Sequence, residues 1–91
     1  MPPVCEANVE VLNAKGLHLH VASLIARAAT PFACDITLVK GEIRANGKSV
    51  MSITLLAAPR GTELQLICDG DDAATAVEEL TQLFADRFGA P

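Results

Sequence analysis

The chain has 91 residues, a formal net charge of −4, 51% apolar residues and 3% aromatic residues. This length allows one domain over residues 1–91, with a modest core of aliphatic side chains that needs neither disulfides nor metal. The acidic balance, the scattered lysines and arginines and the lack of Trp and Tyr argue against nucleic acid as a partner.

Cysteine usage and apolar run lengths indicate the compartment. Cys5, Cys34 and Cys68 are an odd number without CxxC spacing, which is a poor disulfide framework and fits a reducing environment. The start, Met1–Pro3, has no basic segment followed by an apolar one, so no secretory signal is visible. The apolar stretch Val21–Ala29 is broken by an arginine and is too short to cross a bilayer. We therefore expect a cytoplasmic protein without a membrane segment.

The first half of the chain predicts a strand, a helix and a second strand. Val4–Leu12 alternates apolar and polar residues, as a half-buried strand does. The apolar period becomes helical over Leu19–Ala29, and Pro31 ends this helix because proline cannot continue it. Asp35–Lys40 alternates again and predicts the second strand.

The second half predicts two more strands and two more helices. Ile43–Ala45 is a short strand followed by the turn signal Asn46-Gly47, and Ser49 opens a short helix to about Leu56. Glu63–Asp69 is the last strand, and the acidic segment Asp69–Asp72 caps the final helix. The apolar stripe of that helix is Ala73, Ala76, Val77, Leu80, Phe84 and Phe88.

The predicted order βαββαβα belongs to the α+β class. Strands that alternate in polarity indicate an antiparallel sheet with one exposed face rather than a parallel sheet buried on both faces. Three helices on the single apolar face then give an open-faced two-layer sandwich, with a four-stranded antiparallel sheet as one layer.

The segment Lys15–Ala22 contains the residues with the clearest chemistry. Gly16 bends the chain, and His18 stands at the start of the first predicted helix, where backbone N–H groups lack partners and form an anion site. The N–H groups of Leu19 and His20 would hold a phosphoryl group on the His18 ring. The same positive helix end would keep the free ring neutral and nucleophilic. The alternative is an ordinary solvated histidine placed there by chance.

Gly16-Leu17-His18 and, further along the chain, Gly47-Lys48-Ser49-Val50-Met51 are similar to two motifs of the HPr family. The resemblance covers nearly the whole chain, and the predicted order of elements is the order of that fold. It implies a phosphocarrier of the bacterial phosphoenolpyruvate-dependent phosphotransferase system. His18 would accept a phosphoryl group from enzyme I through ring Nδ1 and pass it to enzyme II A components or regulatory targets. Such a protein is a carrier with a phosphohistidine intermediate rather than a turnover enzyme, and it needs no cofactor.

The sequence departs from the family pattern directly after His18. The family has a small residue, an arginine and a proline where this chain has Leu19, His20 and Val21. An arginine offers a permanent charge and a fork of two donors, and losing such a charge-assisted hydrogen bond costs roughly 1.5–3 kcal/mol. A phosphoryl dianion would favour the protonated form of His20, which would then replace the arginine in part. Two alternatives stay open: His20 as a tolerated surface residue, and an HPr-like regulatory protein with weakened or absent phosphotransfer that acts by binding a partner.

Ser49 and its neighbours predict regulation and docking. The resemblance matches Ser49 to a serine that an HPr kinase/phosphorylase modifies in many family members, whereas the residue type alone predicts a helix cap. By analogy with the fold of that family we expect a docking patch for partner proteins, with positive charge at its rim to steer an acidic partner, and a monomeric carrier; the alternative is a plain mixed surface. The residues expected in this patch are Leu17, Leu19, Arg27, Lys48, Val50, Met51 and Ile53.

Two other classes of protein fit the sequence less well. A small metal carrier of βαββαβ order would need a CxxC loop after the first strand, and His18 and His20 straddle a loop–helix junction and need not point the same way. We therefore expect no metal site. An enzyme with turnover of its own would need an acid pair, a triad or a glycine-rich phosphate loop, and none appears.

Overall fold

The computed structural model describes residues 3–89, so Met1 and Pro2 of the expected N-terminal segment and the last two residues of the expected domain lie outside it. The helices and strands follow one another in the predicted order, and a short 3₁₀ segment, η1, comes after the last helix. Their bounds are β1 Val4–Glu10, α1 Leu19–Ala29, β2 Asp35–Lys40, β3 Ile43–Asn46, α2 Val50–Leu55, β4 Glu63–Asp69, α3 Ala73–Ala85 and η1 Arg87–Gly89.

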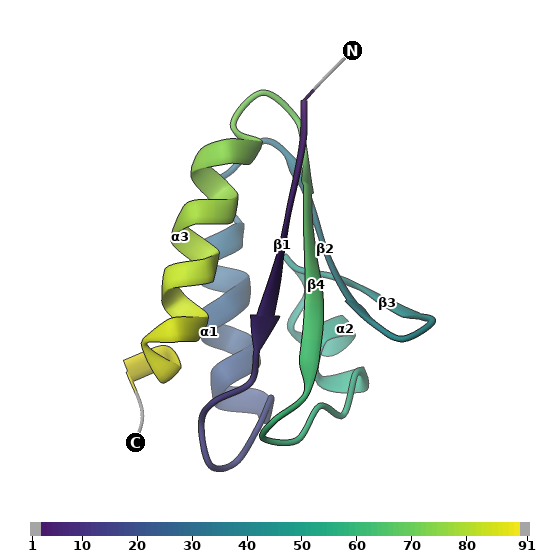
Figure 1. The fold of residues 1–91 in the computed structure, drawn as a ribbon, viewed down its shortest axis with the longest axis vertical. Coiled ribbons are helices and arrows are strands. Elements are labelled where there is room, and N and C mark those ends of the chain that lie inside the picture. Colours follow the sequence, from purple (N-terminus) through teal and green to yellow (C-terminus); the bar gives the residue numbers. More distant parts are fainter. Residues whose placement is uncertain (1–2, 90–91) are drawn as a thin grey trace.

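The four strands form one antiparallel sheet in the order β1-β4-β2-β3. The three helices lie on one side of it, α1 contacts both α2 and α3, and α3 packs on β1 and β4 (Figure 1). The predicted α+β open-faced sandwich is therefore confirmed. Figure 1 also shows that the β1–α1 loop and the loop before β4 meet at the same end of the molecule.

The core lies between the sheet and the helices. Strand β4 is central, and its inward side chains Leu64, Leu66 and Cys68 are all buried, whereas the residues between them are more exposed. The last helix contributes Phe84, whose ring meets that of Phe88 edge-on with centroids 4.8 Å apart. Alternation in the strands and the helical period together account for which side chains are buried.

Two element ends differ from the sequence prediction by more than one residue. Strand β1 stops at Glu10 because Val11 exchanges hydrogen bonds with the loop before β4 instead: its N–H donates to Thr62 O (2.9 Å) and its carbonyl accepts from Gly61 N (2.7 Å). Helix α3 stops at Ala85, and Phe88 reaches the core from η1 with a positive φ of 56° rather than from the helix.

The acidic segment before α3 has a different role from the one predicted. Asp72 occupies the N-cap position, but its side chain makes no cap hydrogen bond to its own helix. Its carboxylate instead accepts from Ala33 N (2.8 Å) and Cys34 N (2.9 Å) in the α1–β2 loop. The first turn of α3 contains no acidic residue, so the expected match of acidic residues to the helix dipole is wrong for that turn.

Within residues 3–89, no helix combines the length and the apolar character that crossing a lipid bilayer requires.

Candidate phosphoryl-acceptor site

The loop between β1 and α1 is held in place by its own turn and by the loop before β4. Gly16 has a φ of +70° and its N–H donates to Asn13 O (3.2 Å). Leu17 N–H donates to Ala58 O (2.9 Å), and its side chain enters the core. The residue that follows, His18, therefore begins α1 from an anchored point.

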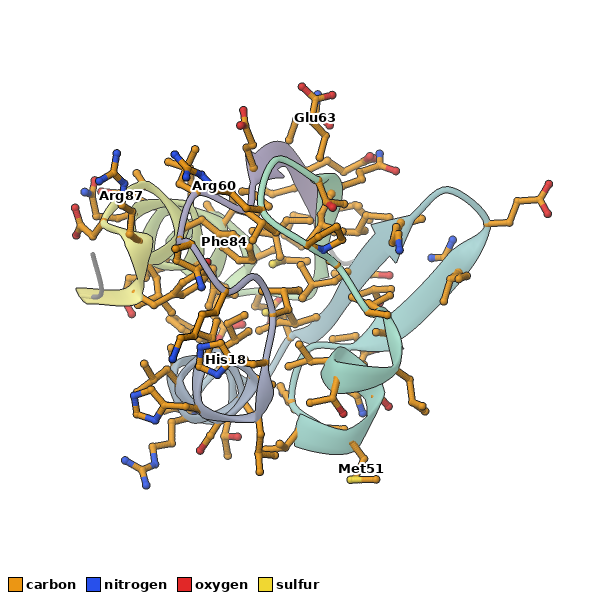
Figure 2. All side chains as sticks on the ribbon, turned by 90° about the horizontal axis from the view of Figure 1, so that it is seen from below. His18, Met51, Arg60, Glu63, Phe84 and Arg87 are labelled. Carbon is orange, nitrogen blue, oxygen red and sulfur yellow. The ribbon has the colours of Figure 1, made fainter. Side chains whose placement is uncertain are left out.

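His18 is the N-cap residue of α1, with φ −77° and ψ 175°, and its side chain makes no cap hydrogen bond. Its ring is half-exposed, and its carbonyl accepts the first helical bond from Ala22 N (2.9 Å). Figure 2 looks along α1 and shows His18 over its first turn. Among residues 3–89, neither Leu19 N–H nor His20 N–H donates a hydrogen bond. The ring thus stands at a helix end with free donors and a positive dipole.

The rings of His18 and His20 lie on the same side of the helix start. Their centroids are 6.2 Å apart and their planes differ by 15°. The sequence left the relative direction of the two rings open, because they sit on either side of a loop–helix junction. The two imidazoles therefore lie next to each other with nearly parallel planes.

Ser49 caps α2, as the residue type predicted. It is the N-cap residue, with extended φ and ψ, and its Oγ accepts from Ser52 N (3.2 Å). The cap satisfies one of the N–H groups that a helix start leaves free. The first turns of α1 and α2 therefore differ, because α2 is capped by a side chain and α1 is not.

The predicted docking residues separate into exposed and buried groups. Leu19 and Met51 are 65% and 69% exposed, and Val50 is half-buried. Leu17 and Ile53 are buried in the core, so their inclusion in a docking patch was wrong. Leu17 anchors the loop before α1, and Ile53 lies on the inward face of α2 because it is two residues from the exposed Met51.

Sequence reasoning missed Leu55, which is 73% exposed on α2. It lies four residues after Met51, and residues four apart share one face of a helix, so the helical period could have found it. We call Leu19, Met51 and Leu55 the apolar patch. Helices α1 and α2, which carry it, contact each other.

The two cations predicted at the rim have different surroundings. The Nζ group of Lys48 donates to Phe32 O (2.5 Å), whereas Arg27 is exposed on α1. Both contribute to an open groove of about 440 Å³ beside α1, and Val50 forms part of its wall. Arg27 is therefore the better placed of the two to meet a partner's carboxylate.

Known proteins similar to this chain agree on one family. The family model described as "PTS HPr component phosphorylation site" matches residues 5–86. The phosphocarrier protein HPr of Treponema pallidum is 41% identical over 80 residues, which cover 88% of this chain and 91% of that protein. The HPr of Neisseria meningitidis serogroup A is 37% identical over 90% of this chain and 92% of that protein. The crystal structure of HPr-C-His from Thermoanaerobacter tengcongensis superposes with a TM-score of 0.91 at 32% identity, covering 96% of this chain and 98% of that one.

This chain belongs to the HPr family. Its membership assigns it a phosphocarrier role in the phosphotransferase system.

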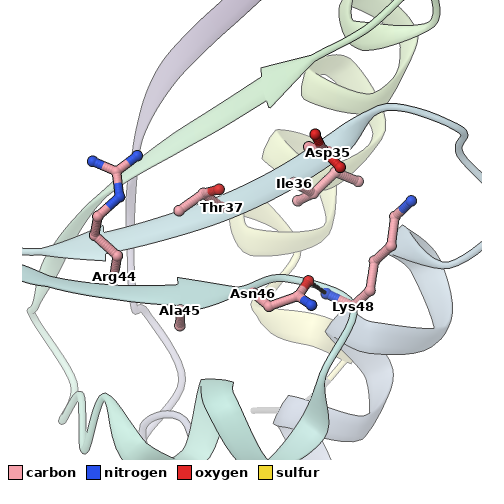
Figure 3. A pocket seen from close by; sticks show the side chains of 7 residues that line it. All are labelled: Asp35, Ile36, Thr37, Arg44, Ala45, Asn46 and Lys48. Atoms are coloured by element: carbon pink, nitrogen blue, oxygen red, sulfur yellow. Dashed lines mark hydrogen bonds between the residues drawn. The ribbon is translucent and has the colours of Figure 1, made fainter.

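A second hollow of this HPr-family protein lies over β2 and β3. It encloses about 430 Å³, and Figure 3 shows Arg44 at one end and Asp35 and Lys48 at the other. The backbone N–H of Lys48 donates to Asn46 Oδ1 (2.9 Å) at its edge. No residue of the His18 loop lines it, so it is separate from the candidate site.

The three cysteines of this HPr-family chain are free thiols. Burial raises the pKa of the Cys68 thiol to about 12, and burial also raises the pKa of Cys34, with the nearby Asp72 carboxylate adding to the effect. Such thiols stay protonated near neutral pH and pack as small apolar groups. Over residues 3–89, His, Cys, Asp and Glu side chains form no group of three or more suited to a metal ion.

Proposed function

We propose that His18 accepts a phosphoryl group from enzyme I and passes it to enzyme II A components or to regulatory targets of the phosphotransferase system. The observation that carries this proposal is a half-exposed imidazole at the N-cap of α1, with the N–H groups of Leu19 and His20 free beside it. A helix start of this kind binds an anion, and the ring supplies the nucleophile.

The transfer needs only the ring and these donors. A ring nitrogen, Nδ1 in the family, gives its lone pair to phosphorus as the bond between phosphorus and enzyme I breaks, and enzyme I keeps that electron pair. The proton of the neutral ring stays on Nε2. The free N–H groups at the helix start then meet the phosphoryl oxygens as they arrive. The return step to an acceptor follows the same path in reverse.

His20 would assist in place of the family's arginine. Its ring is nearly parallel to that of His18, with the centroids 6.2 Å apart, so a phosphoryl group on His18 would be close to it. The dianion favours the charged form of His20, and an imidazolium donates a charge-assisted hydrogen bond. Phosphorylation would then be coupled to uptake of a proton at His20.

Partner proteins would dock on the apolar patch. Leu19, Met51 and Leu55 are exposed apolar side chains on α1 and α2, two helices that contact each other, and Arg27 adds positive charge on α1. An acidic partner would be steered by that charge and held by the apolar contacts. Because successive partners need the same surface free, we expect the carrier to act as a monomer in the cytoplasm.

Ser49 would serve as a regulatory site where an HPr kinase/phosphorylase is present. Its Oγ accepts from Ser52 N, so a phosphoryl group there would stand at the start of α2 and beside Met51 of the apolar patch. A dianion at that place would repel an acidic partner. A mass shift with the kinase and ATP that is absent in Ser49→Ala would establish this role, and no shift would leave Ser49 as a cap alone.

A second function is favoured by His20 and Val21, which replace the family's arginine and proline. With weakened or absent phosphotransfer, the protein would regulate a partner by binding through the same surface.

One experiment separates the two functions. Incubation with enzyme I and phosphoenolpyruvate, followed by intact mass measurement, should add one acid-labile phosphate to the native protein. The phosphate should be absent in His18→Ala and present in Ser49→Ala. A native protein that gains no phosphate, while its fold and its binding to enzyme I are intact, would refute the carrier and favour the regulator.

A further inference from the structure

Asn13 is a polar side chain in an apolar setting. It is 2% exposed, and no other polar or charged side chain within residues 3–89 is buried to this degree. Its Nδ2 donates to Gly16 O (2.8 Å), whereas its Oδ1 is buried and finds no hydrogen-bond partner in the part of the chain that the structure describes. An unpaired buried oxygen destabilises a fold, so its retention calls for an explanation.

The hydrogen bond from Asn13 fixes the peptide group that precedes His18 by one residue. The carbonyl of Gly16 and the N–H of Leu17 belong to the same planar peptide and point in opposite directions. The carbonyl meets Asn13 Nδ2, and the N–H meets Ala58 O at 2.9 Å. This peptide is therefore held at both ends and cannot rotate without breaking two hydrogen bonds.

The same peptide lies in close contact with the loop before β4. A Cβ added to Gly16 would stand 2.5 Å from Ala58 O and 2.9 Å from Pro59 Cα. Gly16 also has a φ of +70°, so the position requires glycine on both counts. Without the hydrogen bond from Asn13, Gly16 would gain conformational freedom, and His18 follows it by only two residues.

We infer that Asn13 is a positioning residue for phosphotransfer. It sets the Gly16–Leu17 peptide, and through it the direction in which the His18 ring and the first N–H groups of α1 meet a phosphoryl group. This role rests on the proposed function of His18. Reacting groups that are misplaced by about 1 Å can lose about a hundredfold in rate, so a small shift of this loop has a large effect.

The variant Asn13→Leu separates positioning from stability. Leucine has the same branched outline with a somewhat larger volume, removes the donor to Gly16 O and also removes the unpaired oxygen. We expect a free energy of unfolding close to that of the native protein, because one buried unpaired oxygen is removed while the Gly16 carbonyl loses its partner. With enzyme I we expect kcat to fall about tenfold and KM to stay the same, because the apolar patch is untouched.

Thr81→Val is the matched control. Among residues 3–89, Thr81 Oγ1 is the other buried side-chain atom without a hydrogen-bond partner, and it belongs to α3 rather than to the loop that carries His18. Its replacement should leave the stability equal or higher and kcat unchanged. If Asn13→Leu keeps a native kcat, or loses stability and activity in proportion, the positioning role is refuted.

Asn13→Asp gives a second measure should the leucine variant fold poorly. A neutral carboxyl donates O–H to Gly16 O and a carboxylate cannot, so kcat relative to native should fall as the pH rises. A constant ratio would count against the proposal.

Phosphorylation by a small molecule tests the positioning role of Asn13 without enzyme I. Phosphoramidate transfers a phosphoryl group to histidine without a partner protein, and NMR then reports the amide protons of Leu19 and His20. In the native protein both should shift downfield on phosphorylation, and in Asn13→Leu the shifts should fall by more than half. Equal shifts in the two proteins would refute the inference, whereas failure with enzyme I alone would refute the proposed function.

Discussion

At the scale of single residues, the His18 region combines a nucleophile and backbone donors without a permanent positive charge. The N–H groups of Leu19 and His20 and the dipole of α1 act on an anion whatever the pH, whereas the His20 ring adds its charge only when protonated. Because the family has an arginine at the position of His20, we expect transfer by this chain to depend on proton concentration.

The substitution His20→Arg tests this dependence. A guanidinium restores a permanent charge and a two-donor fork, and a charge-assisted hydrogen bond of roughly 1.5–3 kcal/mol corresponds to at least a tenfold faster transfer from enzyme I. The native protein should transfer faster at pH 6 than at pH 8.5, and the arginine variant should show no such difference. His20→Ala is the control, expected to be slow at both values. A native rate that is the same at both pH values and matched by His20→Ala would show that His20 is only a surface residue.

At the scale of elements, the N-cap residues of the three helices differ in their side-chain hydrogen bonds. Helix α2 is capped by Ser49, whereas His18 at the start of α1 leaves N–H groups free. At the start of α3, the Asp72 carboxylate bonds to Ala33 N and Cys34 N and ties that helix to the α1–β2 loop. The starts of α1 and α3 thus both lack a side-chain cap, but the N-cap carboxylate of α3 is engaged by another loop, whereas His18 at the N-cap of α1 makes no side-chain cap hydrogen bond.

The contact made by Asp72 predicts an acid-dependent loss of stability. The backbone N–H of Ala33, together with the Cys34 thiol and N–H, holds the pKa of the Asp72 carboxyl below its ordinary value despite partial desolvation. Because the unfolded state binds the proton more tightly, this stabilisation is complete above the unfolded pKa of about 3.9 and is lost as the pH falls through the lower folded value. The native protein should therefore lose its stability advantage over Asp72→Asn between pH 4 and pH 2 in urea unfolding. The neighbouring Asp71→Asn should parallel the native curve, and an Asp72→Asn curve that also stays parallel would contradict the prediction.

The end of α2 predicts a stabilising substitution. Ala57 follows the C-cap of α2 with a φ of 49°, a left-handed conformation that glycine adopts without steric cost. Ala57→Gly should raise the free energy of unfolding by about 1 kcal/mol, measured by urea denaturation. The same change at Ala74, an exposed residue in the first turn of α3, should lower it by at most about 1 kcal/mol. Equal destabilisation at both positions would show that the left-handed conformation carries no strain.

At the scale of the whole molecule, the sequence determines the elements better than their ends and contacts. Alternation and helical period placed β2, β4 and α1 at the observed residues. The end of β1 depends on bonds between Val11 and the loop at Gly61 and Thr62, which no local pattern reveals.

The candidate site shows the same division between local and long-range features. His18 and Ser49 could be predicted as helix caps because glycine, helix start and residue type are local signals. Leu17 and Ile53 are buried by long-range packing in the core. The Gly16–Leu17 peptide is held by Asn13 and by Ala58 O, a contact far away in the sequence, so only the folded chain shows these features.

The placement of exposed apolar residues leads to a prediction about docking. Met51 is 69% exposed in the apolar patch, on a helix that contacts α1, whereas Ile43 is 51% exposed at the start of β3. Met51→Lys should raise KM for enzyme I about tenfold with little change in kcat, because a charge at a desolvated contact weakens binding without moving the ring. Ile43→Lys makes the same change of side chain outside the patch and should leave both constants at native values. Equal effects of the two substitutions would mean that partners recognise a surface other than the one around His18.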